Sequence, residues 1–69
     1  MAKYLVIIEE ASRNLSAYVP DLPGCVATGD TKEETLQCMR EAIAMHLEGL
    51  REDGEPIPLP SSSAEYLAV

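Results

Sequence analysis

Short apolar stretches alternate with polar turns through the first part of the chain, and this pattern predicts β-strands. Residues 4–8 are apolar at every position and rich in β-branched side chains, which is typical of a strand covered on both faces. Residues 15–19 alternate between apolar and polar side chains, as a half-buried strand does, and residues 25–28 form a short third stretch. Residues 9–14 and the proline-containing residues 20–24 connect these stretches. Because both connections are short, we expect an antiparallel meander.

A long helix is predicted after the third strand. Thr31 and Glu34 have the spacing of a capping box, in which two side chains pair with backbone N–H groups at a helix start. The apolar side chains that follow recur at helical spacing, so the pattern predicts a helix from Lys32 to Asp53 with Gly54 as its cap. The apolar stripe expected to face the sheet consists of Leu36, Met39, Ile43, Leu47 and Leu50.

The C-terminal residues are expected to be extended. Residues 55–60 alternate proline with other residues, which excludes a helix and favours a stiff connector. Residues 61–63 form a flexible joint, and residues 65–69 have the composition of a last strand. The expected fold class is therefore α+β with the order β-β-β-α-β: an antiparallel three-stranded meander, one long helix and a C-terminal strand. We expect a single domain over residues 1–69 and no C-terminal DNA-binding domain.

The charge of the chain narrows the class of partner. Twelve acidic and five basic residues give a net charge of -7, which argues against direct binding of nucleic acid or of an anionic membrane surface. No apolar run reaches the roughly 18 residues that span a bilayer, and no signal peptide is recognisable, so we expect the protein in the cytoplasm. An acidic surface suits a basic partner protein.

Catalytic chemistry finds no support in the sequence. The predicted strand interiors contain no Asp or Glu, and the chain has a single histidine, His46, and no phosphate-binding glycine loop. Cys25 and Cys38 are thirteen residues apart, without Cys-x-x-Cys spacing. We expect them to be reduced, packed residues, with a regulatory disulfide or metal pair as the alternative. The chain is expected to be no enzyme and to need no metal or cofactor.

Self-association is also expected. A single helix covers only one face of a sheet. The other face is therefore left uncovered, and it carries every second side chain of residues 4–8. Apolar surfaces of this kind rarely stay exposed in soluble monomers. A second helix stripe of small or soft side chains lies roughly 100–180° from Leu36. This stripe is either part of a wide core face or a contact with another chain, in a dimer or a tetramer. The residues expected at an oligomer interface are Thr35, Cys38, Ala42 and Met45.

Residues 18–34, with the sequence YVPDLPGCVATGDTKEE, resemble the HicB antitoxin family. The family pattern is an aromatic residue, then Pro-Asp/Glu-Leu-Pro-Gly-Cys, a short strand, Gly-Asp-Thr and an acidic capped helix. Residues 40–43 and 57–60 are similar to the helix and the proline segment of the family. The resemblance implies a partial ribonuclease H-like fold without the nuclease carboxylates. It also implies a partner protein: a small basic HicA-like ribonuclease toxin, whose access to messenger RNA the antitoxin blocks. Many members of the family carry an additional domain that binds the operator.

The leading hypothesis is therefore a binding module that neutralises such a toxin. Its acidic charge would steer it onto a basic surface and compete with RNA. The partner-binding residues expected are Tyr18, Asp21, Leu22, Asp30, Glu33 and Glu34. Each also has a structural alternative, since Asp21 could fix its loop and Glu33 and Glu34 could stabilise the helix start. The competing hypothesis is a homo-oligomeric structural or small-ligand-binding domain with no toxin partner.

Overall fold

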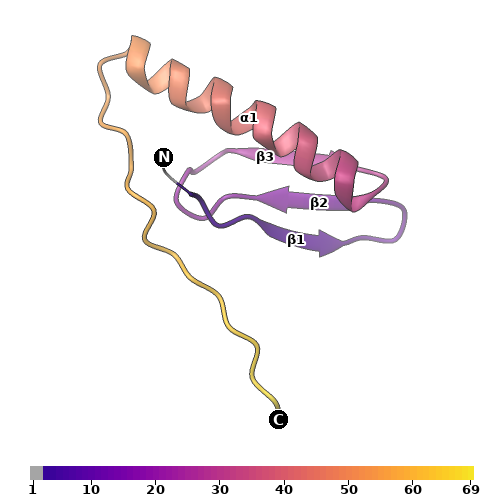
Figure 1. The fold of residues 1–69 in the computed structure, drawn as a ribbon. Coiled ribbons are helices and arrows are strands. Elements are labelled where there is room, and N and C mark those ends of the chain that lie inside the picture. The colour runs from indigo at the N-terminus through magenta and orange to yellow at the C-terminus, as the bar shows by residue number, and fades with distance from the viewer. Residues whose placement is uncertain (1–2) are drawn as a thin grey trace.

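The computed structural model describes residues 3–69 and contains one antiparallel sheet and one helix (Figure 1). Strands β1 (Ile7–Glu10), β2 (Leu15–Tyr18) and β3 (Val26–Gly29) lie in the order β1-β2-β3, and helix α1 (Lys32–Glu52) follows. Each strand pairs with its sequence neighbour, as short connections require. The predicted meander and the predicted long helix are confirmed. The bounds of the first strand are corrected: β1 begins at Ile7 and includes Glu9 and Glu10, which were predicted to lie in the turn.

The register assigns alternate rows of side chains to the two faces of the sheet. One row faces the helix and consists of Ile8, Ala17 and Ala27. The next row faces away from the helix and consists of Ile7, Tyr18 and Val26. Val26 is 64% exposed, so the second face of the sheet is uncovered in this chain, as the sequence predicted.

The core lies between the sheet and the helix and includes the β2–β3 loop. Its buried side chains are Ala17, Val19, Leu22, Cys25 and Met39. Within the loop, the Leu22 N–H donates to the Val19 carbonyl over 3.1 Å, and the Cys25 N–H donates to the Leu22 carbonyl over 3.1 Å. These bonds turn the chain so that Leu22 points inward. Burial raises the pKa of the Cys25 thiol, which is free, as expected for a packed cysteine.

The helix start has the cap that the sequence predicted. The Thr31 hydroxyl oxygen accepts from the Glu34 N–H over 3.1 Å. The Glu34 carboxylate in turn accepts from the Asp30 N–H over 3.4 Å, one residue before the expected capping-box donor. At the other end the helix stops at Glu52, one residue before the predicted end, and Gly54 follows with a positive φ of 70°.

The face that α1 buries is rotated from the predicted stripe. The helix packs on β3 and β2 and not on β1, with Thr35 and Met39 at the centre of its buried face. Leu36 and Leu50 are only half-buried. The cause is a close approach at Gly29, where an added Cβ would lie 2.6 Å from the Thr35 hydroxyl oxygen. Glycine therefore allows the helix start to sit directly on β3.

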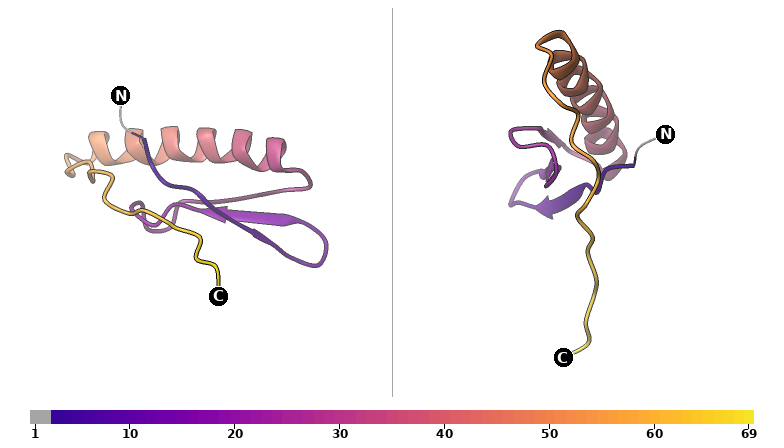
Figure 2. Two further views of the ribbon diagram at one scale, coloured as in Figure 1. Left: turned by 60° about the horizontal axis from the view of Figure 1, so that its bottom comes forward. Right: turned by 90° about the vertical axis from the view of Figure 1, so that its left-hand side faces the viewer.

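The C-terminal residues 55–69 have no regular secondary structure. The first part is an extended connector, as predicted, and is tied to the body where the Tyr4 hydroxyl donates to the Pro58 carbonyl. The last part leaves the body of the molecule (Figures 1 and 2). The strand predicted at residues 65–69 is not formed, because no strand within the described part of the chain pairs with it.

Two glycine substitutions test the packing of the helix on the sheet. Gly29→Ala should destabilise the protein by about 1–3 kcal/mol, because its Cβ overlaps the backbone and side chain of Thr35. Gly49→Ala should stabilise it by about 0.5–1 kcal/mol, because that helix position has open space and alanine reduces the entropy lost on folding. Urea denaturation measures both free energies. Equal effects of the two substitutions would contradict the close approach at Gly29.

A third substitution tests the cap. Thr31→Ala should cost about 1 kcal/mol, because the Glu34 N–H loses its acceptor. Thr31→Ser keeps a hydroxyl and should preserve most of the stability. Thermal unfolding compares the two variants, and an unchanged melting temperature for Thr31→Ala would show that the cap does not support the helix.

Candidate protein-binding surface

Carboxylates gather where β3 passes into α1. Asp30 lies in the connection, and Glu33 and Glu34 lie in the first helical turn, where the positive end of the helix dipole stabilises negative charge. All three residues are exposed, so they are available to a partner as well as to the helix start. The structure thus brings together three of the residues predicted to bind a partner.

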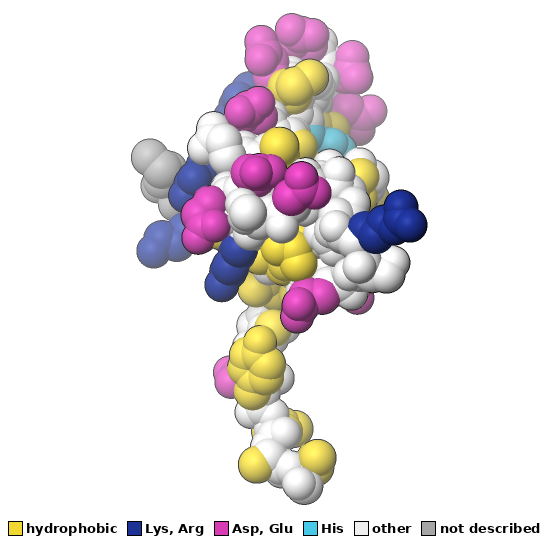
Figure 3. Space-filling model, turned by 90° about the vertical axis from the view of Figure 1, so that its right-hand side faces the viewer, with side chains coloured by type: hydrophobic (Ala, Val, Ile, Leu, Met, Phe, Trp, Pro, Cys, Tyr) yellow, Lys and Arg dark blue, Asp and Glu magenta, His cyan; other side chains and the backbone are white. Residues whose placement is uncertain are grey.

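The sheet adds two further carboxylates to this end of the molecule. Glu10 pairs with Leu15, and Leu15 pairs with Gly29, so β1 and β3 finish at the same end of the sheet. We call this surface the acidic end; it consists of Glu9, Glu10, Asp30, Glu33 and Glu34. Figure 3 looks at this end of the molecule: acidic side chains lie on the face turned to the viewer, with Lys and Arg side chains among them, and a further acidic group lies at the upper, more distant end. Glu9 and Glu10 were not among the residues predicted to bind a partner, because they were predicted to lie in a turn; an antiparallel register extended to these residues would have placed them near Asp30.

Asp21 lies away from the acidic end, in the β2–β3 loop beyond the other end of β3. Its carboxylate accepts four hydrogen bonds from the C-terminal segment. The Ser61 and Ser62 N–H groups donate to Oδ2 over 3.1 and 3.2 Å, and their hydroxyls donate to Oδ1 over 3.0 and 2.9 Å. We call this contact the Asp21 clamp. It gives Asp21 a structural role, which the sequence analysis held open as the alternative to partner binding.

The clamp changes the acidity of Asp21. Partial desolvation of the carboxylate raises its pKa, but the hydrogen bonds from Ser62 and Ser61 act in the opposite direction and together prevail. The pKa of Asp21 therefore lies below its usual value. The two serines were predicted only as a flexible joint, because nothing local in the sequence links them to a residue 40 positions earlier.

The two apolar residues predicted to bind a partner have different positions. Leu22 is 0% exposed and belongs to the core, so it cannot offer its side chain to a partner in this fold. The prediction failed because the hydrogen bonds of the loop turn this side chain inward. Tyr18 is exposed on the uncovered sheet face, next to Val26 of β3. Tyr18 thus remains a candidate.

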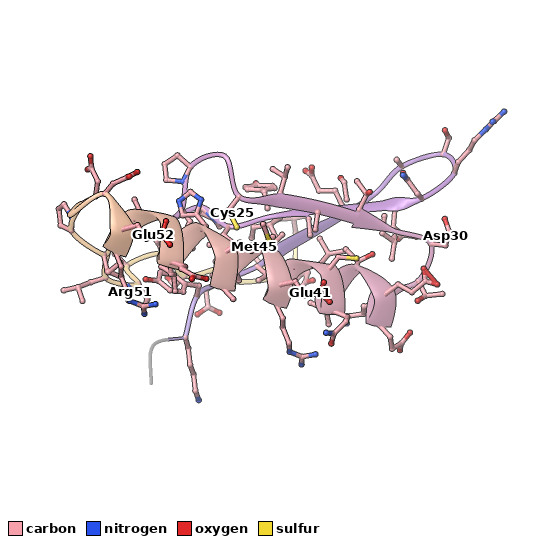
Figure 4. All side chains as sticks on the ribbon, turned by 90° about the horizontal axis from the view of Figure 1, so that it is seen from above. Cys25, Asp30, Glu41, Met45, Arg51 and Glu52 are labelled. Atoms are coloured by element: carbon pink, nitrogen blue, oxygen red, sulfur yellow. The ribbon has the colours of Figure 1, made fainter. Side chains whose placement is uncertain are left out.

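The predicted oligomer stripe is divided by the rotation of the helix. Thr35 is fully buried against β3, and Ala42 packs on the core, so both belong to the wide core face that was one of the two interpretations. Cys38 is exposed, so the prediction of a packed cysteine is wrong at this position, and Met45 is 72% exposed. Figure 4 looks down on the helix, with Asp30 beside its start, Met45 along it and Glu52 at its end.

Residues 3–69 bring no three His, Cys, Asp or Glu side chains together in a way that could hold a metal ion. Over the same residues, no helix combines the length and apolar character needed to cross a membrane.

A pH titration tests the Asp21 clamp. Because the pKa of Asp21 is lower in the folded chain than in the unfolded one, the clamp stabilises fully at neutral pH. Its contribution is lost as the pH falls from about 4 through the folded pKa. The amide resonances of Ser61 and Ser62 should shift together in this range by NMR, and in Asp21→Asn they should not titrate. Amide shifts that follow an ordinary carboxyl midpoint would contradict the clamp.

Comparisons with known proteins identify the family to which the chain belongs. Residues 4–69 match the family model described as a HicB-like antitoxin of bacterial toxin–antitoxin systems. A UPF0150 protein of Thermoplasma acidophilum is 42% identical over 68 residues, which cover 97% of this chain and 96% of that protein. A 14.9 kDa protein from the rep-hol intergenic region of Haemophilus phage HP1 is 38% identical over 64 residues, 93% of this chain and 48% of its own length.

A relative from Photorhabdus laumondii is named Antitoxin HicB 2; it is 32% identical over 63 residues, 91% of this chain and 45% of that protein. The chain thus spans about half the length of the phage and Photorhabdus relatives and almost all of the Thermoplasma relative. The family match covers all three strands and the helix. The chain belongs to the HicB-like antitoxin family of bacterial toxin–antitoxin systems.

Proposed function

We propose that this protein is an antitoxin that neutralises a small basic HicA-type ribonuclease by covering its RNA-binding surface. The observation that carries the proposal is the acidic end, where five carboxylates from β1, the β3–α1 connection and α1 face solvent. A protein that binds messenger RNA needs a cationic surface for the phosphates. A partner that presents carboxylates to the same surface competes with RNA directly.

The charge of the whole chain supports rapid binding. A net charge of -7 produces a negative potential that steers a cationic partner into contact. Steering of this kind raises the association rate and loses strength as salt screens the charges. An antitoxin benefits from fast association, because each free toxin molecule cleaves RNA until it is bound.

The sheet supplies an apolar surface beside the carboxylates. Ile7, Tyr18 and Val26 form one cross-strand row on the uncovered face. Glu9 follows on the same face, since side chains alternate along a strand, and it connects this row with the acidic end. Protein interfaces combine an apolar centre with a polar rim. The proposed footprint therefore has Tyr18 at its centre and Glu9 and Asp30 at its rim.

The proposed action is by binding alone, with no catalytic step and no cofactor, in the cytoplasm where messenger RNA lies. The ribonuclease H-like relationship is part of the same proposal. Three antiparallel strands followed by a helix agree with its first four elements.

Charge reversal at two sites tests the proposed footprint. The combined variant Asp30→Lys and Glu33→Lys should slow association with the toxin by about tenfold at low salt, because it removes attraction at the acidic end. The matched control is Glu48→Lys with Glu52→Lys, which makes the same change in net charge at the other end of α1. Surface plasmon resonance at two salt concentrations measures both rates.

The toxin for this measurement is a small basic ribonuclease, sought first among the products of the neighbouring genes. Circular dichroism should first establish that each variant keeps its helix, because Glu33 also favours the helix start. Equal slowing by both double variants would mean that association depends only on net charge, and this result would contradict the proposed footprint. If no basic ribonuclease binds the unaltered protein, the competing hypothesis of a homo-oligomeric structural or ligand-binding domain replaces the antitoxin role.

A further inference from the structure

An open groove runs between β1 and α1. The helix packs on β3 and β2, so its β1 side has no strand beneath it. Two adjoining hollows mark this side. One is lined by Lys3, Tyr4, Val6, Leu36, Met39, Arg40 and Ile43, and the other by Ile8, Glu10, Leu15 and Lys32. We call the two hollows together the β1 groove.

The groove combines an apolar floor with a basic rim. Leu36 and Ile43, from the most apolar stripe of the helix, remain half-buried there because the chain itself does not cover them. Lys3, Lys32 and Arg40 line the groove together with one carboxylate, that of Glu10, where the groove meets the acidic end. The three cations are three of the five basic residues in a chain of net charge -7, so the rim has a net positive charge. The groove suits an apolar segment that carries negative charge.

The strand beside the groove has a free edge. β1 is the first strand in the sheet order, and within residues 3–69 it pairs only with β2, so its other side carries no strand from the described part of the chain. An edge of this kind accepts a further strand through main-chain hydrogen bonds.

Residues 63–69 have the complementary chemistry. We call this segment the C-terminal arm. Tyr66, Leu67 and Val69 are almost completely exposed, and Glu65 adds a negative charge. The Asp21 clamp fixes Ser61 and Ser62, just before the arm. From there the arm runs away from its own sheet and helix (Figure 2), and its apolar side chains stand clear of the body (Figure 3).

We propose that the C-terminal arm of one chain adds to β1 of a second copy and that two chains exchange their arms reciprocally. Leu67 and Val69 enter the β1 groove of the partner copy and cover its Leu36 and Ile43. Side chains alternate along a strand, so Glu65 lies on the same side as Leu67 and Val69 and meets the basic rim. This assembly does not depend on the proposed antitoxin function.

The dimensions agree with this assembly. The seven residues of the arm extend about 23 Å at about 3.3 Å per residue, which is enough to follow β1 and the residues before it. Leu67 and Val69 of each arm face the groove, while Tyr66 faces the other side of the added strand. Reciprocal exchange gives each dimer two such contacts, and each contact combines strand pairing with apolar burial.

The charge of the arm provides the first test. Glu65→Lys should weaken the dimer more at low salt than at high salt, because a positive charge then meets the basic rim. Glu55→Lys is the matched control: it makes the same charge change in the same C-terminal segment, but before the Asp21 clamp. Equal effects of the two variants would contradict contact between Glu65 and the rim.

The decisive test is the mass of the full chain by sedimentation equilibrium at micromolar concentration. The unaltered protein should have twice the 7.5 kDa chain mass. Leu67→Glu should raise the dimer dissociation constant by about 100-fold or more, because two buried leucines are lost per dimer. Leu59→Glu should leave the dimer intact: Leu59 is 83% exposed, close to the 84% of Leu67, but lies before the clamp. Both residues lie outside the core, so both variants should fold.

Three outcomes would overturn the proposal. An unaltered protein at the chain mass would mean that the arm stays free or folds onto its own β1, and hydrogen exchange of the β1 amides distinguishes these cases. A Leu67→Glu variant that still dimerises would place the interface elsewhere, for example at Met45. Equal dissociation in Leu67→Glu and Leu59→Glu would show that the added charge, and not the arm contact, separates the chains.

Discussion

The contact between Gly29 and Thr35 determines how the helix lies on the sheet. The absence of a side chain at Gly29 lets the backbone of Thr35 approach β3 closely, and the Thr35 hydroxyl donates to the Thr31 carbonyl over 2.7 Å, so its burial leaves no polar atom unsatisfied. The cap at Thr31 then fixes the direction in which the helix leaves the sheet. Because α1 is one continuous helix, this first turn sets the direction in which every later side chain of the helix points.

Two surfaces of opposite character follow from that orientation. Because the helix begins directly after β3, the glutamates of its first turn lie at the same end of the molecule as the glutamates at the end of β1. Because the helix lies over β3 and β2, the space above β1 is open and is bordered by Lys3, Lys32 and Arg40. The proposed basic partner and the proposed second copy would thus bind mainly to different surfaces, which meet at Glu10 and Lys32.

The sequence predicted those parts of the fold that local chemistry decides. The strands follow from alternation and turn residues, and the helix cap follows from the spacing of Thr31 and Glu34. Contacts between distant residues were not predictable in the same way. The rotation of the helix depends on Gly29, the inward turn of Leu22 depends on loop hydrogen bonds, and the role of Asp21 depends on serines 40 and 41 positions later. A strand at residues 65–69 requires an edge to pair with, and the pattern of a sequence does not say which edge that is.

The two sets of hydrogen bonds that attach the C-terminal segment to the body affect the order in which the chain folds. Contacts in the rest of the molecule join elements that are neighbours in sequence or one element apart, so they close short loops and form early. The Tyr4–Pro58 hydrogen bond closes a loop of 54 residues, and the Asp21 clamp closes a loop of about 40 residues. Closing such long loops costs more entropy, so these two contacts form only after the helix has packed on the sheet. We expect the C-terminal segment to attach after the rate-limiting step of folding and to detach first when the protein opens. Its contacts would then govern the rate at which the native state opens and leave the rate of folding almost unchanged.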